Sequence, residues 1–448
     1  MPLLTREEAQ AIADRALRAS KADAVRVIIG SSWSGNTRFS GNEITTSGGI
    51  TDTAVSITST VGKRQASATT NLLDEAGLAR AVEQSERLAR LSPEDPELMP
   101  ELEPQTYAEV QGFATATAEL DAEKRAAAVR SVFEGVSSIP AVDGVRPADL
   151  FVAGFLEATA TAQAIANSKG LFAYHRSSDA SLSTTVRTPD GTGSGYYERG
   201  ARDWSSLDPR DIGTRAARKA VASRNPQAIE PGMYTVVLEP QAVSDLLPIL
   251  RGSFNARSAD EGRSPFSKPE GATKVGEKIA DERVTIFSDP TDAELLSQPF
   301  DGEGLPVKRT VWIENGILKN LAYSRFWAQR KSVEPAGFGG GLKMIGGTKS
   351  TDDLIAGTER GILVTRFWYI RFLDQRTVML TGLTRDGTFL IENGRVTRPL
   401  KNFRFNDSPL LMLSRIDEIG RSERVSSGMV MPSLRVRDFN FSSLSDAV

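Results

Sequence analysis

The first half of the chain changes repeatedly between the hydrophobic spacings of helices and of strands. From Thr5 to Ser20 apolar residues recur at helical spacing, and Glu8 follows Thr5 by three residues, which is a capping-box signature. Helical spacing returns at residues 71–91, 120–136 and 204–224. Segments rich in Thr, Val and Ile predict successive antiparallel strands at 24–30, 36–47 and 51–70, and two more between 148 and 187.

The order of these elements predicts two domains. Four prolines within residues 93–104 exclude regular structure there, so this segment is expected to be a connecting arm. A strand and then a helix are expected from 230 to 250, and strands predominate afterwards. The predicted fold class is α+β. Residues 1–228 would form an antiparallel sheet with helices on one face, and residues 229–448 a strand-rich, sandwich or barrel-like domain.

The sequence Ile-Glu-Asn-Gly occurs twice between strand-like flanks, in the segments Val311–Leu321 and Phe389–Leu400. Asn-Gly supplies the two positive-φ residues of a type I′ turn, so both segments are expected to be tight hairpins. Either an internal repeat or independent selection of the best turn dipeptide explains why this four-residue sequence occurs twice. In either case we expect these segments to have a structural role and no catalytic one.

Composition removes several classes of function. The chain has no Cys, which fits a reducing compartment such as the cytoplasm, and its net charge of −3 offers no long-range attraction for nucleic acid. No apolar run is long enough to span a membrane. The only His, His175, lies in a predicted strand and is expected to have a structural or surface role. One imidazole and no thiolate cannot make a familiar zinc site.

Three further segments carry polar groups in unusual settings. Asp301 and Glu303 flank a glycine and present two carboxylates, although a turn into the strand 307–314 explains them better. The Gly-rich segment 337–347 lacks the Lys-Ser/Thr ending of a phosphate-binding P-loop and is expected to be a mobile or ligand-facing loop. The strand 366–372 carries bulk on both faces, so we expect it to be covered on both sides, with Arg366 either paired to a carboxylate of the chain or recognising the carboxylate of a peptide.

Taken together, these segments resemble the TldD/TldE family, whose second member is also called PmbA. The resemblance covers residues 5–441 and is carried by "NTRFSGNEITTS", "EPGMYTVVLEPQAVSDLL", "PFDGEGLPVKRTVWIENGILKNLAYS", "GTERGILVT", "GTFLIENGRVTRPL" and "PSLRVRDFNF" in that order. It implies a cytosolic peptidase system that degrades unfolded peptides and was earlier described as a modulator of DNA gyrase. In such a system a TldD-type subunit holds zinc with His-Glu-x-x-x-His and a later Cys. A TldE-type partner lacks these ligands and completes a heterodimer around a proteolytic chamber.

In this chain the zinc motif is missing. Counting back without gaps from Ser264-Pro265-Phe266 places the motif on Leu247–Gly252, with Pro248 at the position of the catalytic Glu. No His follows His175, so no other alignment restores the motif. The resemblance therefore implies a TldE/PmbA-like pseudoenzyme with no catalytic residues, no metal and no cofactor of its own, zinc being expected only in the partner.

The expected partners are a TldD-like subunit carrying His-Glu-x-x-x-His and an unfolded peptide, with neither nucleic acid nor a membrane. One alternative is a stand-alone homodimer that binds peptides or acts as a scaffold. Another is a metal-independent hydrolase that uses Asp301 and Glu303 as acid and base. The residues expected to face the peptide or the chamber are Asn255, Arg257, Asp260, Asp301, Glu303, Arg366 and Arg371.

Overall fold

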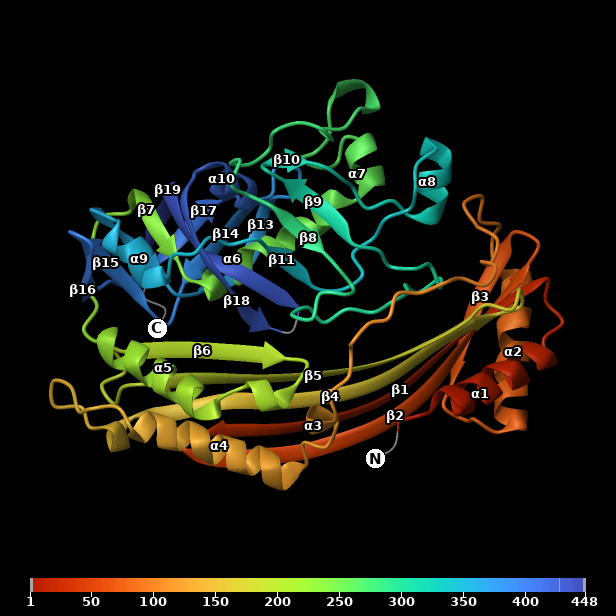
Figure 1. The fold of residues 1–448 in the computed structure, drawn as a ribbon, viewed down its shortest axis with the longest axis horizontal. Coiled ribbons are helices and arrows are strands. Elements are labelled where there is room, and N and C mark those ends of the chain that lie inside the picture. Colours follow the sequence, from red (N-terminus) through yellow and green to blue (C-terminus); the bar gives the residue numbers. More distant parts are fainter. Residues whose placement is uncertain (1–2, 427, 446–448) are drawn as a thin grey trace.

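The computed structural model describes residues 3–426 and 428–445, which form two sheets that lie one above the other (Figure 1). The α+β class is confirmed. The first sheet is antiparallel throughout and has the order β3-β2-β1-β4-β5-β6. Its strands are β1 (Ala24–Ser40), β2 (Glu43–Val61), β3 (Arg64–Thr70), β4 (Phe151–Asn167), β5 (Phe172–Arg187) and β6 (Ser194–Ala201).

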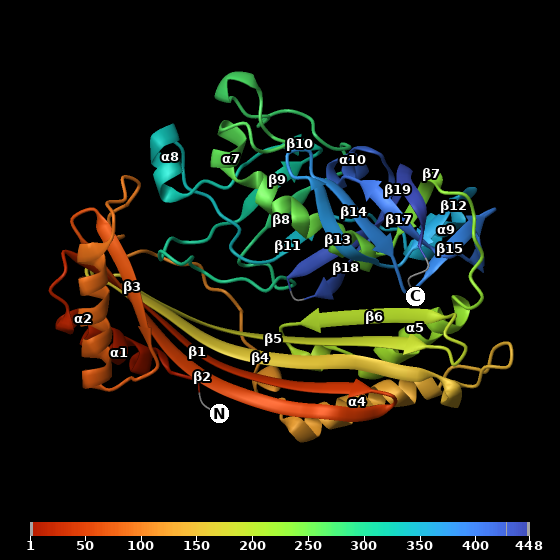
Figure 2. The same cartoon turned by 180° about the vertical axis from the view of Figure 1, so that it is seen from behind.

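Helices cover one face of the first sheet, as predicted. They are α1 (Arg6–Ala19), α2 (Glu75–Leu91), the single turn α3 (Thr115–Ala118), α4 (Ala122–Ser137) and α5 (Pro209–Ala222). The apolar side chains of β1 and β4 alternate, so one set packs on α1 and α2 at one end and on α4 and α5 at the other. Seen from behind, α1, α2 and α4 lie on the side away from the second sheet (Figure 2), whereas α5 reaches the second part of the chain through the Lys219–Glu239 ion pair.

Several local predictions are confirmed. Thr5 and Glu8 form the capping box of α1. The connecting arm, which in the structure comprises residues 92–114, contains no helix or strand. Two details differ. The residues expected to form strands at 24–30, 36–47 and 51–70 are divided differently, because β1 continues to Ser40 and turns at Gly41-Asn42, and β2 runs from Glu43 to Val61 before β3 begins. Strand β6 was not expected from the sequence.

Among the described residues, the second sheet has thirteen strands and is open, so the expected strand-rich domain is present but is not closed into a barrel. The strands are β7 (Gly232–Leu238), β8 (Ile286–Ser288), β9 (Thr310–Glu314), β10 (Ile317–Leu318), β11 (Leu342–Met344), β12 (Arg360–Val364), β13 (Phe367–Asp374), β14 (Met379–Thr384), β15 (Thr388–Glu392), β16 (Arg395–Pro399), β17 (Asn402–Asp407), β18 (Ile416–Ser426) and β19 (Met429–Ser445). The Gly-rich segment expected to be a loop contains β11, which pairs with β8 and β19.

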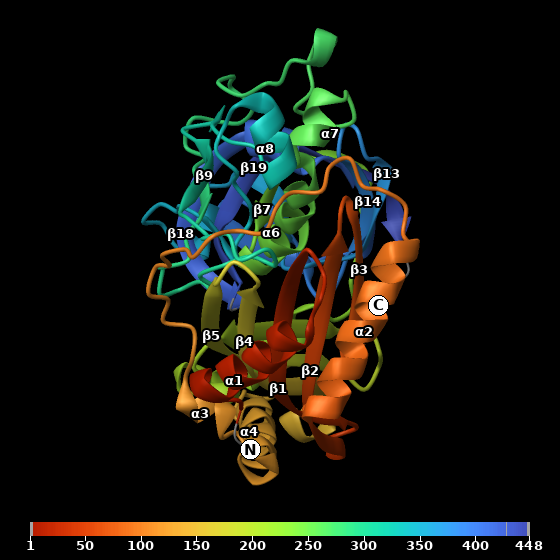
Figure 3. The same cartoon turned by 90° about the vertical axis from the view of Figure 1, so that its right-hand side faces the viewer.

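Short helices accompany this sheet: α6 (Pro240–Leu246), the 3-10 helix η3 (Leu247–Phe254), α7 (Ala256–Asp260), α8 (Arg325–Lys331), α9 (Thr351–Ala356) and α10 (Pro409–Ser414). Viewed from the side, α7 and α8 lie on the same side of the molecule as the arm (Figure 3). Both Ile-Glu-Asn-Gly segments are tight hairpins, β9–β10 and β15–β16, with positive φ at Asn315, Gly316, Asn393 and Gly394.

The strand expected to be covered on both faces is exposed instead. In β13, Trp368, Tyr369, Phe372 and Leu373 keep 40%, 59%, 46% and 56% of their surface accessible. Tyr369 has a φ of +56°, and the register with β14 shifts between Trp368 and Arg371. This break disturbs the alternation of side chains on which the prediction relied.

Among the described residues, the last strand of the first sheet ends at Ala201 and the first strand of the second begins at Gly232. The domain boundary between residues 228 and 229 stays a prediction. No helix in the described part of the chain is long and apolar enough to cross a membrane.

Candidate functional site

Three of the seven predicted site residues lie at α7, and two of them, Arg257 and Asp260, contact α8. Asn255 is the N-cap of α7, where its Oδ1 accepts a hydrogen bond from the Ser258 amide at 2.8 Å. Arg257 lies over the Trp327 ring of α8, 5.2 Å from its centroid, and forms ion pairs with Glu97 of the arm and with Glu261. The carboxylate of Asp260 accepts from Trp327 Nε1 at 2.6 Å and pairs with Lys331 at 3.0 Å.

Asp301 and Glu303 lie on a turn that reaches the start of α8. Asp301 Oδ1 accepts hydrogen bonds from the amides of Glu303 and Leu305, both at 2.9 Å, so it holds the turn closed. Glu303 pairs with Arg325 at 2.7 Å, and Arg325 also donates to the carbonyl of Pro100 in the arm. The interpretation of this loop as a turn is confirmed. Both carboxylates are engaged by groups of the chain itself.

The remaining two predicted residues lie elsewhere. Arg366 forms an ion pair with Asp386 at 3.1 Å and stacks on the Tyr196 ring of β6, 3.7 Å from its centroid. The expected carboxylate partner is therefore present, and the contact joins the two sheets. Arg371 is exposed on β13, over the ring of Tyr369. The structure thus brings Arg257, Asp260 and Glu303 into contact with α8, with Asn255 and Asp301 in the adjoining turns, and separates Arg366 and Arg371 from them.

Beside Arg366 lies a buried carboxyl that the sequence did not single out. Asp245 of α6 accepts hydrogen bonds from the Phe367 amide at 2.8 Å and from Gln241 at 3.0 Å. Burial raises the pKa of Asp245 to about 7, against the opposing effects of these hydrogen bonds and of Arg366. Burial also raises the pKa of Tyr196, whose hydroxyl donates to Glu198.

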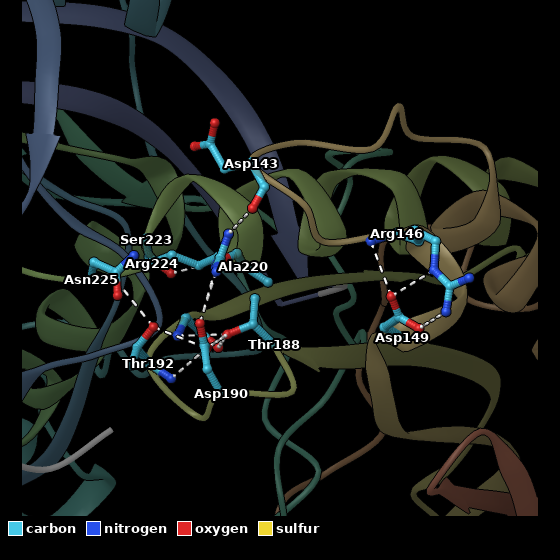
Figure 4. A network of polar contacts seen from close by, with 11 residues as sticks. Asp143, Arg146, Asp149, Thr188, Asp190, Thr192, Ala220, Ser223, Arg224 and Asn225 are labelled. Carbon is cyan, nitrogen blue, oxygen red and sulfur yellow. Dashed lines mark hydrogen bonds and ion pairs between the residues drawn. The ribbon is translucent and has the colours of Figure 1, made fainter.

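A cavity of about 340 Å³ lies between the β5–β6 turn, the end of α5 and the second sheet. Asp386 enters its wall and accepts a hydrogen bond from Ser194 Oγ at 2.6 Å. Figure 4 shows the neighbouring network, in which Asp190 accepts from Thr188, Thr192 and Arg224. These hydrogen bonds hold the pKa of Asp190 well below its usual range. The network fixes the β5–β6 turn against α5.

The arm lies between the first sheet and the second. The Tyr107 ring packs on Phe300 and its hydroxyl donates to the carbonyl of Gly304 at 2.8 Å, and burial raises its pKa to about 12. Farther along, Gly112 lies against His175 so closely that a Cβ at position 112 would be 2.4 Å from Nε2. Burial lowers the pKa of His175, and a hydrogen bond to the Ser297 backbone opposes this.

The position at which the zinc motif was sought is the helix η3. Leu247 and Leu250 are buried in the main apolar core of the second sheet. Phe254, at the end of η3, meets a stack of rings in which Trp312 and Phe338 lie 3.8 Å apart and nearly parallel. Arg251 lies over Phe338, 4.8 Å from its centroid. Within the described residues, no three His, Cys, Asp or Glu side chains are grouped so that they would hold a metal ion.

Sequence reasoning missed the residues that this geometry emphasises: Asp245, Tyr196, Asp386, Tyr107, Arg251, Trp312 and Phe338. Asp245 and Arg251 lie within or beside an apolar run, and a charged residue there is a usable signal. The aromatic residues carried no such signal, because their meeting depends on contacts far apart in sequence.

Comparison with known proteins gives one family across the chain. Models for the PmbA/TldA metallopeptidase match its domain 1 at residues 25–89, its central domain at 114–224 and its C-terminal domain at 231–443.

Among the curated relatives, a metalloprotease of Methanothermobacter thermautotrophicus is 28% identical over 60% of this chain, which spans only 62% of the relative's length. The metalloprotease PmbA homolog of Haemophilus influenzae is 24% identical over 85% of this chain and 84% of its own.

Two solved structures share the fold. TldE of Thermococcus kodakarensis superposes with a TM-score of 0.84 at 19% identity, over 97% of this chain and 99% of its own. A proposed modulator of a DNA gyrase from Thermotoga maritima gives 0.85 at 19% identity, over 97% of this chain and all of its own. With three models of one family in succession along the sequence, the chain belongs to the PmbA/TldD family.

Proposed function

We propose that this chain is a cytoplasmic, non-catalytic subunit of a TldD/TldE-type metallopeptidase heterodimer, which completes the proteolytic chamber and helps bind unfolded peptides. The observation that carries the proposal is the composition of η3. Where the resemblance calls for two His and a Glu, the chain has Leu247, Pro248 and Gly252. Because Leu247 is buried in the core, an imidazole there would lose packing without gaining a metal.

The first sheet supports a role in binding extended peptides. Strand β3 pairs only with residues 55–61 of β2, so residues 43–54 form an outer edge of the sheet. This edge contains no Lys or Pro, the residues that commonly protect a strand from further pairing. An added strand would bind through backbone hydrogen bonds, with little preference for its sequence.

Strand β13 supports a protein partner. Its four exposed large apolar residues are Trp368, Tyr369, Phe372 and Leu373. A group of this kind, rich in aromatic residues, is typical of the core of a protein–protein interface. The TldD-like subunit is the partner that the family suggests.

The test is an affinity purification of the tagged full chain from its native lysate, with mass spectrometry of co-eluting proteins and a zinc assay. We expect one partner in equal amount, carrying His-Glu-x-x-x-His, with zinc in proportion to that partner. A chain that returns alone, dimeric and without zinc would contradict the heterodimer and favour the stand-alone peptide-binding protein. Peptidase activity of the chain alone, retained with chelator, would favour the hydrolase instead.

A further inference from the structure

Arg251 carries a half-buried guanidinium that has no hydrogen-bond acceptor and no carboxylate partner among the described residues. Arg125, in contrast, is almost fully buried and donates to Thr37 Oγ1 and to the carbonyls of Leu120 and Gly48. Desolvation lowers the pKa of the Arg251 guanidinium and no ion pair opposes it. The charge of Arg251 therefore has no partner within the described fold, and its half-buried guanidinium stays accessible to an anion.

Aromatic packing fixes the position of this side chain. Phe338 lies between the Trp312 ring, 3.8 Å away at an interplanar angle of 20°, and the guanidinium of Arg251, 4.8 Å from the ring centroid. Phe254 packs edge-on against Phe338 and at a tilt against Trp312. A guanidinium held over a ring keeps its N–H groups in a defined plane, which suits the two oxygens of a carboxylate.

Trp312 is fully buried, but there is open space beside Arg251 and beside Phe338. A Cβ placed on Gly252, next to Arg251, or on Gly337, next to Phe338, would meet no atom within 4 Å. Phe338 also lines a groove of about 430 Å³ between the extended segments 305–311 and 334–339. The groove's charged residues are two acids and two bases: Asp301, Glu334, Lys308 and Arg309. Lys308 pairs with Glu334, and Arg309 pairs with Asp289, which lies outside the groove lining. Arg251 is not part of the lining but lies next to the groove through its contact with Phe338, and unlike these two bases it has no acidic partner among the described residues.

We propose that Arg251, held by the Trp312–Phe338 stack, binds a carboxylate of an extended peptide that lies along this groove. The inference rests on the proposed peptide-binding function and adds to it the chemical group that is recognised. A C-terminal carboxylate and an Asp or Glu side chain present the same two oxygens, so the experiment has to separate the two sources.

The experiment measures fluorescence anisotropy of a labelled, unstructured ten-residue peptide titrated with the full chain. Three versions are compared: one without Asp or Glu and with a free C-terminus, the same peptide amidated, and an amidated peptide with one internal Glu. Each is measured with the natural chain, Arg251→Met, Arg251→Lys, and the control Arg6→Met. Arg6 also lies over a phenylalanine ring, that of Phe172, but in the first sheet.

We expect the natural chain to bind at least one carboxylate-bearing peptide about 10- to 100-fold more tightly than the amidated peptide without Glu, as for a charged hydrogen-bonded pair. Arg251→Met should remove this difference, Arg251→Lys should keep part of it, and Arg6→Met should keep all of it. A preference for the free C-terminus identifies the main-chain carboxylate, and a preference for the internal Glu identifies an acidic side chain.

Equal binding of all three peptides by the natural chain would overturn the carboxylate site and leave the proposed peptide binding intact. Failure to bind any peptide would overturn the proposed function and this inference with it. Thermal unfolding distinguishes a structural role, because replacing an unpartnered, half-buried cation with Met should leave Tm within about 2 °C. A large fall in Tm for both Arg251 variants would assign Arg251 to the fold and overturn the proposal.

Discussion

At the scale of single residues, the contact between the two sheets depends on a few buried charges. Asp386 is almost fully buried, accepts from Ser194 of the first sheet and pairs with Arg366 of the second. Asp245 lies beside this group with a pKa raised to about 7. The sequence predicted that Arg366 would need a carboxylate, because a buried guanidinium requires one. It did not identify Asp386, because that choice depends on how distant strands meet.

Asp245 gives the first prediction, which concerns stability and pH. Its pKa is about 7 in the fold and about 4 in an unfolded chain, so the native state binds the proton more tightly. Stability from this group is complete below pH 4 and is lost as pH rises through 7. We expect Asp245→Asn to raise the free energy of unfolding by about 3 kcal/mol at pH 8 and hardly at all at pH 4.

Denaturant unfolding of both chains at four pH values between 4 and 8 measures this. A gain that does not change with pH would show that Asp245 titrates normally.

At the scale of elements, the sequence was most reliable where local chemistry decides the structure. Asn-Gly specified both hairpins, and Thr5 with Glu8 specified the start of α1. It failed where glycine serves packing rather than turning. Gly35 interrupts the pattern in β1, yet the strand continues through it. The glycine makes room for Arg125, since a Cβ there would lie 2.4 Å from that side chain. Gly195 in the unpredicted β6 likewise makes room for the Ala216 carbonyl of α5.

The hairpin turns give the second prediction. Gly316 has a φ of +75°, and a Cβ there would lie 2.4 Å from the Ala280 carbonyl oxygen. Gly62 has a φ of +61° but open space around it. We expect Gly62→Ala to cost about 1 kcal/mol, the backbone penalty alone, and Gly316→Ala about 2–4 kcal/mol, because the clash adds to it. Denaturant unfolding measures both, and equal losses would mean that the β9–β10 turn moves away from Ala280 at no cost.

The exposed strand β13 gives the third prediction. The double variant Trp368→Ser/Phe372→Ser should weaken association with the TldD-like partner by about 2 kcal/mol or more, as for paired hot-spot residues. Its free chain should lose about 1–3 kcal/mol in the free energy of unfolding, because each side chain buries more than half of its surface, and it should stay folded. Leu91→Ser, an exposed position on α2, is the matched control. Unchanged partner affinity in a calorimetric titration would remove β13 from the interface.

At the scale of the whole molecule, the resemblance predicted the family and the hydrophobic pattern predicted the α+β class, and the predicted site residues only partly cluster. Arg257, Asp260 and Glu303 contact α8, because α7 and the turn at Asp301 both reach that helix. Arg366 and Arg371 belong to other surfaces. Polar residues on loops can be recognised from sequence, but their grouping is set by long-range contacts that no local pattern records.

Charge reversal gives the fourth prediction, at the contacts between parts of the molecule. Arg366→Glu would place a third carboxyl beside Asp386 and Asp245, so we expect a loss of about 3–5 kcal/mol in the free energy of unfolding. Arg257→Glu removes exposed ion pairs to Glu97 and Glu261, which solvent screens, and should leave the free energy of unfolding nearly unchanged. Complex formation and peptidolysis with the partner are measured in parallel. If both variants left these unchanged, neither arginine would face the chamber.

The place of β19 in the second sheet has a consequence for how the protein is made. This strand is formed by residues 429–445, yet it lies inside the sheet and pairs with β7, β11, β17 and β18. The first sheet is complete in sequence by Ala201 and folds during synthesis, since domains fold as units from the N-terminus. The second sheet lacks this interior strand until residues 429–445 have been translated. Until then the nascent chain exposes the edges of β7 and β17 that β19 later covers, and unpaired edges of this kind can pair with other chains.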